Sequence, residues 1–142
     1  MSSKLTALLT IAVVTVGLNV ALSRRTEASP PVPLPSPFVG TWKTTWTPHY
    51  GGPEVKAPVT VSVDTSDPNA LDGVVEVKGP NGMMYGAVSL AGAVWTWKGN
   101  WWNNDGTHGS FTFTLSEKTG KSFTGSYKIA GSEKAYGWSG TK

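Results

Sequence analysis

From residue 38 to the end of the chain, apolar and polar side chains alternate in short runs that glycine-rich turns separate. Alternation with a period of two is typical of a β-strand that buries one face, and no run there needs the longer period of a helix. The turn residues divide this region into eight expected strands, at about 38–46, 58–65, 70–78, 83–90, 93–102, 109–116, 121–129 and 134–141. We therefore predict an all-β domain.

The first four expected strands are similar in sequence to the last four. Apolar and glycine positions of the two halves match at a constant offset of 52 residues. They are Val59, Val61, Val63, Leu71, Gly73, Val75, Val77 and Gly79, matched by Phe111, Phe113, Leu115, Phe123, Gly125, Tyr127, Ile129 and Gly131. Because any two alternating hairpins can be aligned in this way, chance is the alternative to a duplication. A duplication predicts two four-stranded meanders, about 38–90 and 93–142, which close into an eight-stranded antiparallel up-and-down barrel without exposed edges.

Strand parity separates an aromatic face from a polar face. The expected inward set is Trp42, Trp46, Leu71, Val75, Val77, Tyr85, Trp95, Trp97, Trp101, Phe111, Phe113, Leu115, Phe123, Tyr127, Ile129, Tyr136 and Trp138. Glycines within strands, such as Gly86 and Gly99, fit the bends of a small curved barrel. An eight-stranded barrel is wide enough to be filled by its own side chains or to hold one small ligand. The central rings can thus form a packed core or line a cavity.

The chain begins with a leader-like segment. Residues 5–22 form an uncharged, mainly apolar run, preceded by Lys4 and followed by Arg24-Arg25. Such a run predicts an apolar helix that acts as a secretory signal peptide or a membrane anchor. We expect export: residues 1–29 are cleaved and the protein is secreted or periplasmic, or residues 5–22 tether a barrel outside the cytoplasm. Residues 30–37 are proline-rich, as in an extended linker, which places the barrel domain at 38–142.

Charge and cysteine content exclude several classes of function. The formal net charge is +3, but three basic residues and one acid place +2 in residues 1–29, and nine lysines against eight acids leave +1 for the rest. These lysines form no run, so we expect no nucleic-acid partner. The absence of cysteine excludes disulfides, thiolate metal sites and cysteine nucleophiles. A transmembrane barrel is disfavoured, because it needs longer strands with an apolar outer face.

The opening of the barrel region resembles a known superfamily. Residues 38–43, Phe-Val-Gly-Thr-Trp-Lys, are similar to the Gly-x-Trp opening of the calycins, which include lipocalins, fatty-acid-binding proteins and avidins. Residues 97–101 and 122–127 are more weakly similar to two avidin strands. The resemblance implies a small β-barrel in which Trp42 closes one end. The avidin biotin-binding Asn-x-x-Gly-Ser segment is absent after Trp42, so biotin binding is not implied.

Two consecutive tryptophans mark the expected binding region. On a strand, Trp101 and Trp102 point to opposite faces, so one of them lies near solvent. The loop 103–108, Asn-Asn-Asp-Gly-Thr-His, adds amides, a carboxylate and an imidazole, which suit a sugar ring or a polar head group. The predicted ligand-binding residues are Trp46, Tyr50, Tyr85, Trp101, Trp102, Asn104, Asp105, His108 and Trp138. Alternatively, Trp102 covers a barrel end and the loop is a turn.

These patterns predict an exported, non-enzymatic barrel that binds a small hydrophobic or carbohydrate-like ligand through aromatic residues, without a cofactor. One alternative is a structural or interaction module with a packed interior. Another is a metal-dependent enzyme that uses His49 and His108, which the repeat would bring to one rim. No metal-ligand spacing accompanies these histidines. The expected partner is a small molecule or glycan, and the oligomeric state is not predicted.

Overall fold

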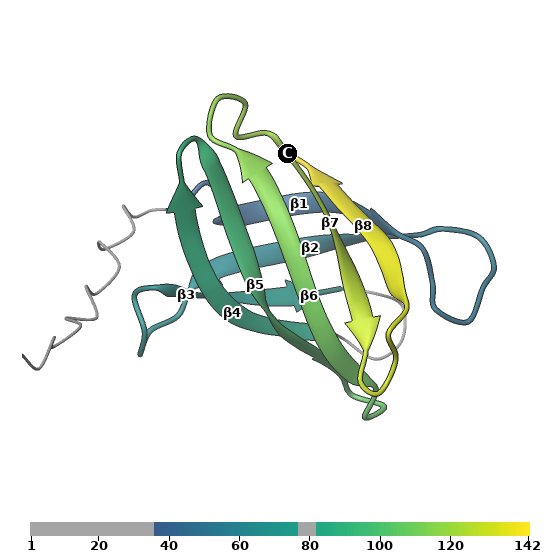
Figure 1. The fold of residues 1–142 in the computed structure, drawn as a ribbon. Helices are drawn as coiled ribbons and strands as arrows, with labels where there is room; N and C mark the ends of the chain where they lie inside the picture. Colours follow the sequence, from purple (N-terminus) through teal and green to yellow (C-terminus); the bar gives the residue numbers. More distant parts are fainter. Residues whose placement is uncertain (1–35, 77–81) are drawn as a thin grey trace, which may run out of the picture.

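The computed structural model describes residues 36–76 and 82–142, which form eight strands and no helix. The strands are β1 (Gly40–Trp46), β2 (Val55–Val63), β3 (Ala70–Val75), β4 (Gly82–Ala91), β5 (Val94–Asn103), β6 (His108–Ser116), β7 (Ser122–Ile129) and β8 (Ala135–Thr141). Each strand pairs antiparallel with the next, and β8 pairs with residues 43–46 of β1, so the sheet is a closed barrel (Figure 1). The predicted all-β, eight-stranded antiparallel barrel is confirmed. The leader and residues 30–35 of the linker lie outside the described residues.

Strand β2 begins at Val55, earlier than the alternation predicts, because Pro58 is accommodated inside it. Ala57 and Val59 on either side of this proline are buried, so the alternation continues through it. The Pro58 carbonyl accepts a hydrogen bond from the backbone N–H of Glu76 at 3.1 Å, just beyond the end of β3. The proline therefore removes one ladder bond at the end of a strand pair, where this loss is tolerated. The expected third strand is observed to residue 75, and residues 77 and 78 lie outside the described part.

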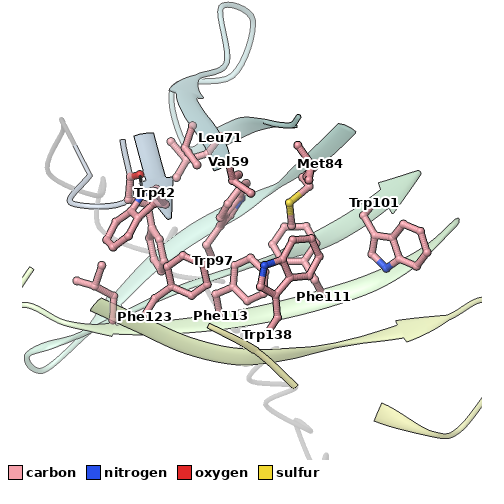
Figure 2. Close-up of a cluster of buried hydrophobic side chains, with 14 of the residues drawn as sticks. Trp42, Val59, Leu71, Met84, Trp97, Trp101, Phe111, Phe113, Phe123 and Trp138 are labelled. Atoms are coloured by element: carbon pink, nitrogen blue, oxygen red, sulfur yellow. Dashed lines mark hydrogen bonds between the residues drawn. The ribbon is translucent and has the colours of Figure 1, made fainter. Parts of the chain in front are cut away.

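Side chains from all eight strands fill the middle of the barrel. Figure 2 shows this cluster, which extends from Trp42 and Phe123 on one side to Trp101 on the other. The Phe113 ring packs against Phe123 with centroids 4.6 Å apart and against Trp138 edge-on at 5.3 Å. Offset and edge-on contacts of this kind add to the burial of aromatic surface. Of the central aromatics, Trp42, Trp97 and Phe113 are buried and belong to the packed core, whereas Trp138 is buried but also lines a cavity.

Tyr85 was expected to point inward, and this expectation is wrong. On β4 the buried positions are the even ones, so Met84 points inward and Tyr85 is 39% exposed. The reason lies on the neighbouring strand, whose Trp97 indole occupies the interior beside β4 and donates a hydrogen bond to the Gly86 carbonyl at 3.2 Å. Directly paired residues point to the same face of a sheet, and Tyr85 pairs with the exposed Asn100 of β5. The register between β4 and β5 therefore sets the parity of β4.

One end of the barrel is closed by the segment before β1. Phe38 is fully buried, and its carbonyl accepts a hydrogen bond from Trp42 Nε1 at 2.6 Å. Lys142 Nζ lies 4.4 Å from the centre of the Trp42 ring and donates to the carbonyls of Pro37 and Val39, each at 2.7 Å. Burial lowers the pKa of the Lys142 ammonium. These contacts hold residues 37–39 across the end of the barrel as a plug, so any opening lies at the opposite end.

Candidate ligand-binding cavity

A cavity of about 270 Å³ lies at the end of the barrel opposite the plug. Because the strands alternate in direction, this end carries the loops 47–54, 104–107 and 130–134, and the first of them extends beyond the strands (Figure 1). The lining residues are Trp46, Pro48, His49, Tyr50, Val55, Val75, Gly82, Met83, Met84, Trp101, Asn103, Asp105, Thr107, Tyr127 and Trp138. A concave, largely apolar site with a few polar groups is the usual form of a small-molecule site.

Four lining rings form a continuous wall on one side of the cavity, from β1 through β8 and β7 to β5. Trp46 of β1 packs on Trp138 of β8 with centroids 4.9 Å apart. Trp138 meets Tyr127 of β7 edge-on at 5.7 Å, and Tyr127 meets Trp101 of β5 edge-on at 5.7 Å. Tyr50 is 75% exposed in the loop after β1 and stands at the mouth of the cavity. Rings held at fixed angles by one another provide a preformed aromatic surface.

Hydrogen bonds fix the orientation of two of these rings. Tyr127 donates from its hydroxyl to the Thr47 carbonyl at 2.7 Å, which ties β7 to the start of the β1–β2 loop. Trp101 Nε1 donates to the Lys128 carbonyl at 3.1 Å. Both residues are more than nine-tenths buried, so their polar atoms are satisfied by the fold itself. Trp138 Nε1, by contrast, is buried without a hydrogen-bond partner in the described residues.

The charge in the cavity lining is negative. Asp105 Oδ1 accepts a hydrogen bond from the backbone N–H of Thr107 at 2.8 Å. This bond, the Thr107 hydroxyl and the nearby His49 hold the pKa of the Asp105 carboxyl below its usual value. Asp105 is therefore ionised at neutral pH, and no lysine or arginine is among the lining residues.

Five of the nine predicted binding residues line this cavity: Trp46, Tyr50, Trp101, Asp105 and Trp138. The other four lie outside it. Tyr85 and Trp102 are on the outer face, each 39% exposed, and Asn104 is exposed in the turn after β5. His108 is exposed at the start of β6, with Nδ1 3.1 Å from the Gly106 carbonyl. The expectation that one of Trp101 and Trp102 lies near solvent is confirmed, because Trp102 is 39% exposed whereas Trp101 is 6% exposed.

Several lining residues were not predicted as binding residues. Tyr127 was expected to point inward, but nothing in its strand pattern placed it at an opening. Met84 and Val75 belong to the same inner surface, at the ends of β4 and β3. Two sequence features together indicate a lining residue at this end of the barrel. The residue has inward parity, and it lies near the strand end from which the long β1–β2 loop leaves. That combination could have identified Tyr127 and Val75, whereas Met84 required the corrected parity of β4.

The two histidines lie at the same end of the barrel but not in the same setting. His49 lines the cavity and packs edge-on against Tyr50 at 5.1 Å, whereas His108 is not a lining residue. Within residues 36–76 and 82–142, no group of three or more histidine or acidic side chains could hold a metal ion. The same residues contain no helix that is long and apolar enough to cross a membrane.

No protein-family model matches the chain, and no curated protein is similar to it in sequence. Among solved structures, a redesigned β-barrel is similar with a TM-score of 0.55 and 14% sequence identity. The similarity covers 75% of this chain and 91% of that chain. At this identity the likeness concerns the fold alone, and it agrees with the closed eight-stranded barrel described above.

Tyr127 is expected to be the last tyrosine to ionise. Burial, the largest effect, raises the pKa of its hydroxyl from 10.0 to about 12. Because the folded-state pKa lies above the unfolded one, the stability that this group contributes is complete below pH 10 and is lost as the pH rises toward 12. An alkaline titration of phenolate absorbance measures this directly. The Tyr127→Phe variant should lack the step at highest pH, and retention of that step would contradict the prediction.

Proposed function

We propose that this chain is a non-enzymatic binding barrel that holds one small hydrophobic or carbohydrate-like ligand in the cavity at its open end. The observation that carries the proposal is the asymmetry of the two ends. One end is closed by Phe38, Trp42 and Lys142, and the other has a cavity walled by rings that are fixed before any ligand arrives. Preorganised rings lower the cost of binding, because their side chains lose little further freedom.

A calycin-like architecture is the finer part of this proposal. Supporting it, Trp42 closes one end of an eight-stranded barrel, as the Gly-x-Trp resemblance implies. The origin of the barrel in two duplicated meanders also belongs to the proposal and rests on the 52-residue offset. Export through residues 1–29, with secretion or tethering, rests on the apolar run at 5–22.

Ligand binding is tested by following intrinsic tryptophan fluorescence of the full chain during titration. The probes are N-phenyl-1-naphthylamine as a neutral hydrophobic molecule, methyl hexosides as carbohydrates and choline as a small charged molecule. We expect a saturable change with at least one probe. Trp46→Ala should weaken its binding about tenfold, because a stacking surface at the cavity wall is lost.

The control for this experiment is Trp102→Ala, which removes a tryptophan from the outer face. It should leave the midpoint of the titration unchanged. If Trp46→Ala and Trp102→Ala weaken probe binding equally, the probe does not bind in the cavity. No saturable response to any probe would overturn the proposed function.

An interaction module is the second candidate, and one observation favours it. Val74, Met83 and Trp102 are direct cross-strand neighbours on β3, β4 and β5, and their exposed fractions are 39, 46 and 39%. A contiguous exposed apolar row of this kind is a common feature of interaction surfaces. A titration without any saturable response would favour this second candidate.

A further inference from the structure

The rings of the cavity provide a surface that attracts positive charge. Aromatic faces carry negative partial charge, and a cation within about 6 Å of a ring centre is bound more strongly when water is excluded. Trp46, Trp101, Tyr127 and Trp138 belong to the wall, and all except Trp46 are less than a tenth exposed. Tyr50 adds a fifth ring at the mouth. A small cation that enters here lies in a cavity lined by aromatic side chains from several strands.

Among the described lining residues one carboxylate, that of Asp105, carries the negative charge that would attract such a cation. Asp105 lies on the β5–β6 loop at the rim, and its hydrogen bond with Thr107 uses Oδ1. The loop therefore holds this exposed carboxylate in place at the rim of the cavity. An ionised acid beside aromatic faces favours a cationic ligand and disfavours an anionic one.

Two lysines of the described residues on this side of the barrel, Lys128 and Lys134, make contacts away from the cavity. Lys128 points its ammonium toward Glu133, with 3.6 Å between Nζ and Oε2. Lys134 Nζ lies 5.1 Å from the centre of the Tyr136 ring, and neither lysine is a lining residue. The remaining titratable groups of the lining are His49 and the two tyrosines. Within residues 36–76 and 82–142, Asp105 is thus the lining group that carries a full charge at neutral pH.

The geometry points to a small organic cation, with a substituted ammonium group, as the class of ligand that this cavity holds. This inference rests on the binding role of the cavity in the proposed function, and it assigns to that cavity a cationic ligand class. The cavity volume of about 270 Å³ lies near the lower limit of ordinary ligand sites, so one compact head group fits and a long chain does not. The ammonium would stack among the rings, and Asp105 would face it from the rim.

The test compares two probes of the same shape that differ in charge. Choline carries a quaternary ammonium, and 3,3-dimethyl-1-butanol replaces the nitrogen by a neutral carbon. Both are titrated into the full chain at constant ionic strength while tryptophan fluorescence is recorded. We expect choline to bind at least tenfold more tightly than the neutral alcohol, about 1.4 kcal/mol.

Two pairs of variants locate the effect. Asp105→Asn should weaken choline binding several-fold and leave the neutral alcohol unaffected. Its matched control is Asp67→Asn at the opposite end, where Asp67 accepts the same kind of hydrogen bond from the Asn69 N–H at 2.9 Å. Tyr50→Ala should weaken choline binding, whereas Tyr50→Phe should preserve it, because the phenyl face remains. Tyr50 is 75% exposed, so neither change threatens the fold.

Equal binding of choline and the neutral alcohol would overturn the cation inference and leave the proposed binding function in place. Weakening of choline binding by Asp67→Asn to the same degree as by Asp105→Asn would also overturn it. If choline fails to bind while the naphthylamine or a hexoside does, only the ligand class is wrong. If no probe binds, the inference and the proposed function fail together.

Discussion

Trp42→Ala should destabilise the barrel by about 3–5 kcal/mol, the usual range for removing a fully buried large aromatic side chain. Trp42 is fully buried, and its ring packs edge-on against Phe123 with centroids 5.1 Å apart. Its loss also removes the hydrogen bond to the Phe38 carbonyl and the ring beneath the Lys142 ammonium. The variant would therefore lose core packing and, at the same time, the contacts that hold residues 37–39 at the end of the barrel. Thermal unfolding followed by circular dichroism should show a Tm lowered by more than about 10 °C.

Trp102→Ala is the matched control, because it removes the same side chain from a half-exposed position on the outer face. It should cost less than about 1 kcal/mol. If both variants lose similar stability, the closed end is not anchored by Trp42. If Trp42→Ala instead keeps its Tm, the calycin-like closure proposed for this end is wrong.

The fold could be predicted from the sequence because its main signal is local. Alternation along each run and turn residues between runs depend on neighbouring residues only, and consecutive antiparallel strands then pair in order. The error at Tyr85 has a non-local cause. Strand β4 has bulky apolar residues at both parities, and its register with the next strand decides which set points inward.

The candidate site was predictable in part for the same reason. The opposite faces of Trp101 and Trp102 follow from strand geometry, and the rim position of Asp105 follows from its turn. Whether the barrel is filled or hollow depends on how its rings pack at each level. Phe38 and Phe123 fill one end together with Trp42, and no ring from the plug reaches the other. The difference in free volume between the two ends depends on three-dimensional packing and cannot be predicted from the spacing of residues in the sequence.

Gly99→Ala is expected to destabilise the barrel strongly, although it adds only one methyl group. Gly99 of β5 pairs directly with Gly86 of β4, and the two backbones approach closely at this bend. A Cβ on Gly99 would meet the Tyr85 carbonyl oxygen, and it would lie 2.5 Å from the Gly86 Cα. Backbone atoms of a paired strand cannot rotate away as a flexible side chain can, so the strand pair itself must separate. Overpacking ordinarily costs about 1–3 kcal/mol, and we expect the upper end of this range or beyond.

Gly137→Ala is the control for this change, because Gly137 also lies within a strand yet has open space around it. The nearest atom to a Cβ there is Thr47 Oγ1 at 3.9 Å, which is ordinary contact. We expect a Tm within about 2 °C of the wild type for Gly137→Ala and a loss on the order of 10 °C for Gly99→Ala. Similar stability of the two variants would mean that β4 and β5 are not bent together at the glycine pair. Trp97, which is buried in the centre of the barrel, donates a hydrogen bond to the Gly86 carbonyl at 3.2 Å, so separation of this strand pair would also disturb the packing of the core.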